Sequence, residues 1–187
     1  MSTIALTMVV CNEEEKLEEM LKYHAPLVDE IVIVVQESED RTLEIAKKYA
    51  TTVIEAPCVG FCEPHRHLAH LHAHSDWQLC LDADERITPE FAEQMRDLMA
   101  KGNSGYIMER RTSLDDVVST PRGDGQYRFY NRKNVYFLPS IHTGPHAYDV
   151  STVVTFDGIG IEHKKTWKQY KNGLLRVEKI IDGTWKK

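Results

Sequence analysis

Short apolar runs alternate with amphipathic segments over the first half of the chain. Residues 4–10 and 31–35 form nearly unbroken apolar runs, which are typical of strands buried on both faces of a sheet. Shorter runs at 52–54 and 77–81 predict two more strands. The pattern therefore predicts four buried strands before residue 90.

A segment with helical spacing of its apolar residues follows each predicted strand. Asn12 is placed to cap the first helix and Ser38 or Asp40 the second, the third covers 65–74, and Thr88 precedes the fourth. Strands and helices in this order predict an α/β fold, with a mostly parallel sheet and helices on both faces. Ligands of such sheets bind at the carboxyl ends of the strands.

After Gly102 the pattern changes to short predicted strands near 126–131, 135–138 and 153–161. We expect this part to be a small α+β extension that covers the sheet within the same domain. Residues 164–187 would follow as a basic helical tail with apolar residues at helix-like spacing. We favour packing of this helix on the sheet, and the alternative is peripheral contact with an anionic membrane.

The composition is that of a globular protein, with 42% hydrophobic and 28% charged residues among 187. No apolar run approaches the ~20 residues of a transmembrane segment, and no basic segment precedes Ile4, which argues against a signal peptide. We therefore expect a cytoplasmic protein whose four cysteines are reduced thiols. The net charge of −6 disfavours non-specific binding of nucleic acid.

Two carboxylates, Asp82 and Asp84, directly follow the predicted fourth strand. In an extended chain, side chains at i and i+2 point to the same side, so both would lie at the edge where ligands bind. Their oxygens suit Mg²⁺ or Mn²⁺ shared with the phosphates of a nucleotide. The alternative is an acidic cluster that only favours the start of the helix after Thr88.

A zinc site is a competing interpretation of the region from Cys58 to His74. Cys58, Cys62 and five histidines within 65–74 offer suitable ligands. Their spacing matches neither a zinc ribbon nor a radical iron–sulfur motif. We therefore disfavour a zinc or redox site there.

Four motifs stand in the order and spacing of a known family: Cys11-Asn12-Glu13-Glu14, Asp40-Arg41-Thr42, Gly60-Phe61 with Arg66, and Asp82-Ala83-Asp84-Glu85-Arg86. With them the chain resembles the family 2 inverting glycosyltransferases of the GT-A fold, especially the short bacterial lipopolysaccharide-core type. The resemblance covers residues 3–95 and continues more weakly to His163. It implies a single GT-A domain over 1–187, with a nucleotide-sugar-binding half at 1–102 and an acceptor-side half at 103–163.

The resemblance implies a metal-dependent transferase that moves a hexose from a nucleoside-diphosphate sugar, with a UDP-sugar favoured, to a hydroxyl acceptor. The acceptor would be a lipid-linked saccharide, a protein, a metabolite or a modified base. The implied cofactor is Mn²⁺ or Mg²⁺, and the implied metal ligands are Asp82, Asp84 and His163. The residues implied in donor binding are Val10, Cys11, Asn12, Glu13, Gln36, Arg66, Asp82, Ala83 and Asp84.

Two positions depart from the family pattern. Val35 ends the second strand where the family has an acidic residue for the base, so Gln36 or Glu37 would have to compensate. Thr143 stands where the family often has the carboxylate of the general base. The leading candidates for the base are then Asp124 and His142, with Glu109 and Asp149 as alternatives.

Simpler interpretations remain for several of these residues. Asp124, between glycines, is also a typical turn residue, and Arg128, which alternates with aromatics, is more simply part of a solvated strand face than a diphosphate clamp. Two other functions stay open. One is a catalytically inactive nucleotide-sugar-binding module, and the less favoured one is a nucleotidyltransferase, since the acidic run at 13–15 is the opposite of a basic, glycine-rich phosphate loop.

Overall fold

The computed structural model describes residues 2–118, 123–138, 144–181 and 183–184. His142, one candidate for the general base, and Thr143 lie outside these residues. The helices of the described chain are α1 (Glu14–His24), α2 (Thr42–Tyr49), α3 (Glu63–His72), α4 (Pro89–Met99) and α5 (Trp167–Ile181).

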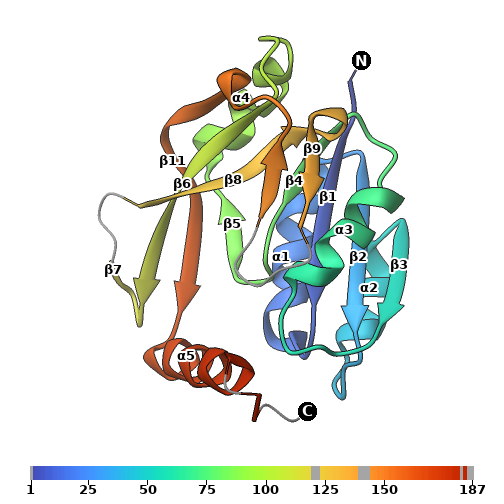
Figure 1. Ribbon diagram of the computed structural model, residues 1–187, viewed down its shortest axis with the longest axis vertical. Helices are drawn as coiled ribbons and strands as arrows, with labels where there is room; N and C mark the ends of the chain where they lie inside the picture. Colours follow the sequence, from blue (N-terminus) through green and yellow to red (C-terminus); the bar gives the residue numbers. More distant parts are fainter. Residues whose placement is uncertain (1, 119–122, 139–143, 182, 185–187) are drawn as a thin grey trace.

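The first half of the chain forms the parallel part of one large sheet (Figure 1). Its strands are β1 (Ile4–Val10), β2 (Glu30–Gln36), β3 (Thr52–Ala56) and β4 (Trp77–Cys80). β1 lies between β2 and β4, β3 extends the sheet beyond β2, and all three pairings are parallel. These are the four strands that the apolar runs predict, and their carboxyl ends share one edge of the sheet.

The second half lengthens this sheet, so the prediction that it would cover the sheet is wrong. Its strands in the sheet are β6 (Gly105–Leu114), β7 (Val117–Val118), β8 (Asp124–Asn131) and β11 (Val153–Lys165), and β11 also pairs with β5 (Glu85–Ile87) of the first half. From β4 onward the order is β8, β6, β11, β5, with β7 beside β6. β9 (Val135–Phe137) and β10 (Pro145–Ala147) form a separate pair. β8 is internal because it pairs with both β4 and β6, and its Phe129 and Tyr130 are fully buried.

Helices cover both faces of the parallel strands, as predicted (Figure 1). Leu6 and Met8 of β1 face a cluster that includes apolar residues of α1, α2 and α4. Ala5 and Val9, at the alternate positions, face Ala69 of α3. Small residues on this second face allow α3 to lie close to the sheet. The alternation of β1 thus divides the core between two layers.

The start of α1 differs from the prediction that Asn12 caps it. Asn12 has a positive φ of 53°, and its side-chain oxygen accepts a hydrogen bond from the backbone N–H of Glu39 at 2.8 Å. Asp40 accepts bonds from the backbone N–H groups of Thr42 (2.9 Å) and Glu14 (3.1 Å). One carboxylate therefore satisfies the first turns of both α1 and α2.

Helix α5 does not bury its apolar residues on the sheet, contrary to the interpretation that we favoured. No residue of α5 is buried, and Leu175 is 54% exposed. The reason is that β6 and β11 extend beyond the ends of the other strands of the sheet, and α5, which follows β11, lies beyond those ends (Figure 1). Its Arg176, Val177 and Ile180 line a pocket together with the segment 60–63. None of the described helices is long and apolar enough to span a membrane.

His24, at the end of α1, is a buried neutral imidazole. Its Nε2 accepts a hydrogen bond from the backbone N–H of Ile87 at 3.3 Å, so Nδ1 carries the proton and donates to the carbonyl oxygen of Met20 at 2.8 Å. Burial lowers the pKa of His24 to about 4. Protonation of the ring would break the bond to Ile87.

We expect His24 to make the protein sensitive to acid. Its pKa is lower in the folded chain than in the unfolded chain, so its contribution to the free energy of unfolding is complete above pH ~6.5 and falls as the pH decreases. At pH 4.5 the loss is about 2–3 kcal/mol. Urea unfolding at pH 7 and 4.5 should show this loss in the wild type and in His74→Gln, a change of an exposed histidine. An undiminished loss in His24→Gln would contradict the assignment.

Candidate active site

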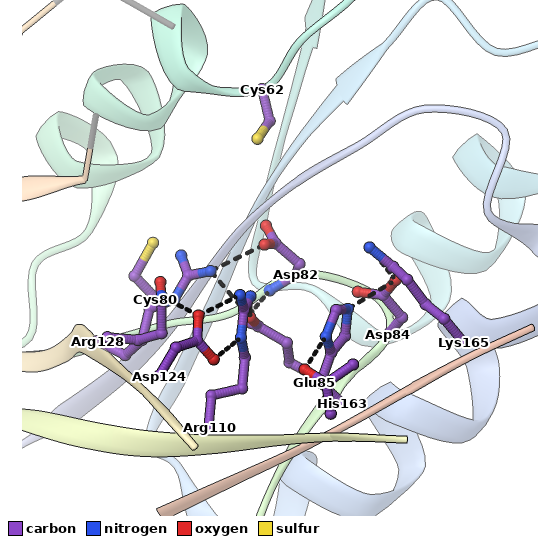
Figure 2. Close-up of polar contacts among 12 residues, drawn as sticks. Cys62, Cys80, Asp82, Asp84, Glu85, Arg110, Asp124, Arg128, His163 and Lys165 are labelled. Carbon is purple, nitrogen blue, oxygen red and sulfur yellow. Dashed lines mark hydrogen bonds and ion pairs between the residues drawn. The ribbon is translucent and has the colours of Figure 1, made fainter. Parts of the chain in front are cut away.

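The chain turns after β4 instead of remaining extended. Residues 83–84 form a turn, and Glu85 then begins β5. The backbone N–H of Asp82 donates to Oε2 of Glu85 at 3.0 Å, and the backbone N–H of Glu85 donates to the carbonyl oxygen of Asp82 at 3.1 Å. The expectation that Asp82 and Asp84 point to the same side assumed an extended chain and does not hold. The two carboxylates contact different partners (Figure 2).

Asp82 lies between two buried arginines. Its Oδ1 accepts a bond from Nη2 of Arg66 at 2.7 Å, and its Oδ2 accepts one from Nη2 of Arg128 at 2.9 Å. Arg66 and Arg128 are each only 5% exposed. Burial raises the pKa of Asp82, but the two guanidiniums outweigh burial and hold the pKa well below its usual range. Asp82 is therefore ionised, with one oxygen bound to each arginine.

The ion pairs continue through Glu85, which is 1% exposed. Its Oε1 accepts bonds from Nη2 of Arg128 (2.9 Å) and Nη1 of Arg110 (2.8 Å). Arg110 also binds Asp124 through two bonds of 3.1 and 2.7 Å. We call these six residues the arginine–carboxylate network: Arg66, together with Asp82, Arg128, Glu85, Arg110 and Asp124, which Figure 2 labels. It joins α3, the turn after β4, β5, β6 and β8.

Arg128 corrects the interpretation of β8 as a solvated face. β8 pairs with β4 on one side and β6 on the other, so it is an internal strand of the sheet. Arg128 is buried, and its guanidinium binds Asp82 and Glu85. Arg66 was expected to reach the base or the diphosphate, but its guanidinium contacts Asp82 and the sulfur atoms of Cys62 and Cys80, both at 3.2 Å. In the sequence, the available signal for a buried Arg128 was its position among the aromatic residues 127–130.

Asp84 faces a second group of polar side chains. Its Oδ2 lies 3.3 Å from Nε2 of His163, 3.4 Å from Nζ of Lys165 and 3.7 Å from Nζ of Lys16. The antiparallel pairing of β5 with β11 places His163 opposite Glu85 and thereby beside Asp84. Burial raises the pKa of Asp84, but His163 and Lys165 outweigh it and lower the pKa. The sequence predicted Asp84 and His163 here but missed both lysines.

Asp84 and His163 form the part of the site that could hold a divalent cation. Neighbouring ligands of an octahedral ion with bonds of about 2.1 Å lie about 3 Å apart, close to the observed 3.3 Å between Oδ2 and Nε2. Oγ1 of Thr112 lies 3.0 Å from Nδ1 of His163 and orients the ring. The described residues contain no group of three metal-binding side chains, and the oxygens of Asp82 are bound to arginines. Within the described ranges the site thus offers two ligands, which suits an ion completed by phosphate and water.

The remaining residues expected to bind a donor lie along the same edge. Val10 ends β1 and is buried, Cys11 and Glu13 are partly buried and Asn12 is exposed, and Ala83 lies in the turn before Asp84. Gln36, however, is 2% exposed, and its Nε2 donates to the carbonyl oxygen of Phe61 at 2.8 Å. The amide of Gln36 is thus engaged inside the protein.

Asp124 does not lie in a glycine loop but is the first residue of β8. Its carboxylate is engaged by Arg110, and although burial raises its pKa, the bonds from Arg110 lower it. Asp149 caps a short helical turn through Ser151 at 2.9 Å, and Glu109 is partly buried in β6. The structure therefore places Asp124 in the network, where both of its carboxylate oxygens are bound by Arg110.

Glu13, at the start of α1, has properties that the sequence did not predict. Burial raises its pKa to about 7; Lys16 opposes this rise, and the negative charges of Asp84 and Asp82 add to it. An acid with this pKa in a cluster of charges is typical of functional sites. Glu13 thus gains or loses a proton near neutral pH at the same edge as Asp84.

Comparison with known proteins connects this site to a family. A family model described as Glycosyl transferase family 2 matches residues 6–151. An uncharacterized glycosyltransferase of Rickettsia typhi is 26% identical over 156 residues, which cover 78% of this chain and 52% of that protein. A TPR repeat-containing protein of Synechococcus elongatus is 31% identical over 143 residues, which cover 76% of this chain and 35% of that protein. The chain thus spans about half of the length of the first relative and less of the second.

Solved structures share the fold. S. aureus TarS (1–349) in complex with UDP-GlcNAc has a TM-score of 0.64 and 16% identity, covering 87% of this chain and 58% of that chain. Glucosyl-3-phosphoglycerate synthase from Mycobacterium tuberculosis, in complex with Mn²⁺, UDP and glucosyl-3-phosphoglycerate, has a TM-score of 0.58 and 15% identity, covering 97% of this chain and 79% of that chain. At such identities the likeness concerns the fold alone.

Breaking the arginine–carboxylate network should lower the free energy of unfolding far more than breaking a surface ion pair. Arg128→Met leaves Glu85 and one oxygen of Asp82 without this partner, and we expect a loss of about 3–5 kcal/mol in the free energy of unfolding. Arg96→Met, which removes an exposed pair with Asp29, should cost less than about 1 kcal/mol. Urea unfolding of both variants measures the difference. Equal, small losses would contradict the structural importance of the network.

We expect Glu13 to destabilise the protein as the pH rises. Its pKa is higher in the folded chain, so folding favours the protonated form, and stability is lost between pH ~4.5 and ~7. Without divalent cations, Glu13→Gln should therefore be about 2–3 kcal/mol more stable than the wild type at pH 8 but not at pH 4. Glu15→Gln, at an exposed position of α1, is the matched control. No pH-dependent gain in Glu13→Gln would disprove the raised pKa.

Proposed function

The chain belongs to glycosyltransferase family 2 and has the GT-A fold, and from this premise we propose that it is a metal-dependent inverting hexosyltransferase. The proposed donor is a nucleoside-diphosphate sugar, with UDP-sugar favoured, and the acceptor group is a hydroxyl. The observation that carries the proposal is the pair of Asp84 and His163 beside two lysines at the end of β4. The complexes of TarS with UDP-GlcNAc and of the mycobacterial synthase with Mn²⁺ and UDP support it.

In this proposal, Asp84 and His163 hold Mn²⁺ or Mg²⁺. When bound, the cation supplies Lewis-acid neutralisation of the charge that grows on the departing diphosphate. An imidazole ligand favours Mn²⁺ over Mg²⁺. Thr112 keeps His163 in the orientation that the cation needs.

Lys16 and Lys165 provide positive charge that belongs to the chain itself. Both ammonium groups lie within 4 Å of Asp84, where they would attract the diphosphate and help to hold it. They come from opposite ends of the sequence, one from α1 and one from the last residue of β11. Donor binding would therefore depend on both halves of the domain.

Deprotonation of the acceptor needs a group that can take a proton within hydrogen-bond reach. Asp124 is a poor proton acceptor because Arg110 stabilises its carboxylate form. Of the two leading candidates, His142 is therefore preferred, since the imidazole of histidine is a common general base near neutral pH.

The engaged state of Asp124 also favours a second candidate function, an inactive module that binds a nucleotide-sugar without transferring it. Turnover decides between the two. The acceptor remains a lipid-linked saccharide, a protein, a metabolite or a modified base. Contact of α5 with a membrane also remains a prediction, since its apolar residues are exposed beside lysines.

The nearly isosteric change Asp84→Asn, which removes one negative charge, should separate these functions. In calorimetry, the wild type should bind UDP at least tenfold more tightly with Mn²⁺ than without it, and Asp84→Asn should lose this difference. Slow release of UDP from UDP-hexoses should fall at least 100-fold in the variant if the chain is an enzyme. Asp97→Asn, at an exposed position of α4, is the control for the loss of one carboxylate.

Binding of UDP that is equal with and without Mn²⁺ in the wild type would contradict the metal role. Metal-dependent binding by the wild type without any sugar release, over a panel of donors and acceptors, would favour the inactive module.

A further inference from the structure

Two thiols that are far apart in the sequence meet at the edge of the sheet. Cys11 follows β1 and Cys58 follows β3, and their Sγ atoms lie 3.6 Å apart. This is the distance of two sulfur atoms in contact. A disulfide bond is about 2.05 Å long, so bond formation requires the two sulfur atoms to approach by only about 1.5 Å.

The fold itself produces this contact. β1, β2 and β3 are adjacent and parallel, so the segments after their carboxyl ends lie together. Hydrogen bonds hold the chain to the end of β2 both before and after Cys58. Before it, the backbone N–H of Glu37 donates to the carbonyl oxygen of Ala56 at 2.9 Å. After it, Nε2 of Gln36 donates to the carbonyl oxygen of Phe61. The thiol of Cys11 donates to the carbonyl oxygen of Glu37 at 3.6 Å. Both thiols are thus held against the end of the same strand.

The other two cysteines are in different surroundings. Cys80 is buried, and its sulfur accepts a bond from Arg66. Burial raises the pKa of the Cys62 thiol to about 12, which keeps it protonated and poorly reactive at neutral pH. Cys11 and Cys58 are both partly exposed. Cys62 is partly exposed as well, but the pair whose sulfur atoms lie in contact is Cys11 and Cys58.

We propose that Cys11 and Cys58 are a redox modification site, at which a small-molecule disulfide such as glutathione disulfide converts the two thiols into one intrachain disulfide. This site differs from the cysteine and histidine cluster disfavoured from the sequence, because Cys11, which follows β1, lies outside that cluster. It does not depend on the proposed transferase activity.

The reaction proceeds by two exchanges. One protein thiol loses its proton and attacks the small disulfide, which forms a mixed disulfide and releases one small thiol. The second protein thiol then attacks the protein sulfur of the mixed disulfide and releases the other small thiol. The two protein thiols are oxidised by two electrons in total, and one small disulfide is reduced to two thiols. The product ties the end of β1 to the segment that leads into α3.

Peptide mapping of the whole protein tests the proposal. The chain is incubated with glutathione disulfide at pH 8, quenched with acid, alkylated under denaturing conditions and digested without reduction. We expect a linked peptide joining Cys11 to Cys58, loss of two of the four thiols, and return of both after dithiothreitol. A map with only glutathione adducts, or with Cys58 linked mainly to Cys62, would overturn the proposal.

Three variants sharpen the test. Cys11→Ser and Cys58→Ser should each abolish the linked peptide and keep a glutathione adduct on the remaining thiol, whereas Cys62→Ser should keep the link between Cys11 and Cys58. Circular dichroism checks the fold of each variant. If a variant does not fold, the wild-type map alone still decides, because it identifies both linked residues.

Discussion

Asp82 at the end of β4 is held by two guanidinium groups that are almost completely buried. Removing two arginines and a carboxylate from water is costly, and the cost is recovered only if every charge finds a partner in good geometry. The network meets this condition by alternating three arginines with three carboxylates. Such a network contributes more to a defined arrangement of the chain than to net stability. Here it fixes the turn from Asp82 to Glu85.

That turn divides the acidic segment into two parts with different tasks. Asp82 and Glu85 point into the arginine–carboxylate network, while Asp84 between them points to His163, Lys165 and Lys16. The network therefore supports the turn that presents Asp84 to His163 and the two lysines. If Asp84 holds a cation as we propose, this support would keep it in position when the ion and the diphosphate bind, which is the preorganisation that transfer chemistry requires. The two halves of the chain meet here, since His163 and Lys165 come from β11.

The parallel strands and their helices could be predicted because apolar runs and helical spacing are local properties of the sequence. The place of β5, β6, β8 and β11 in the sheet could not, because it depends on pairings between distant segments. The same limit holds for the site. That Asp84 would lie at this edge of the sheet could be predicted from its position after an apolar strand, and that His163 would lie near it from the family resemblance. The partners of Asp82 did not follow, because Arg66 and Arg128 reach it from α3 and β8. The prediction that Asn12 caps α1 was wrong because its side-chain oxygen accepts a hydrogen bond from the backbone N–H of Glu39 instead.

The most direct test of the account is a crystal structure of the protein with UDP and MnCl₂, with anomalous diffraction data collected at the manganese edge. We predict one strong anomalous peak about 2.1–2.2 Å from Oδ2 of Asp84 and Nε2 of His163, with the diphosphate of UDP on its open side and the ion pairs of Asp82 unchanged. A manganese peak elsewhere, or UDP bound away from the end of β4, would contradict the account.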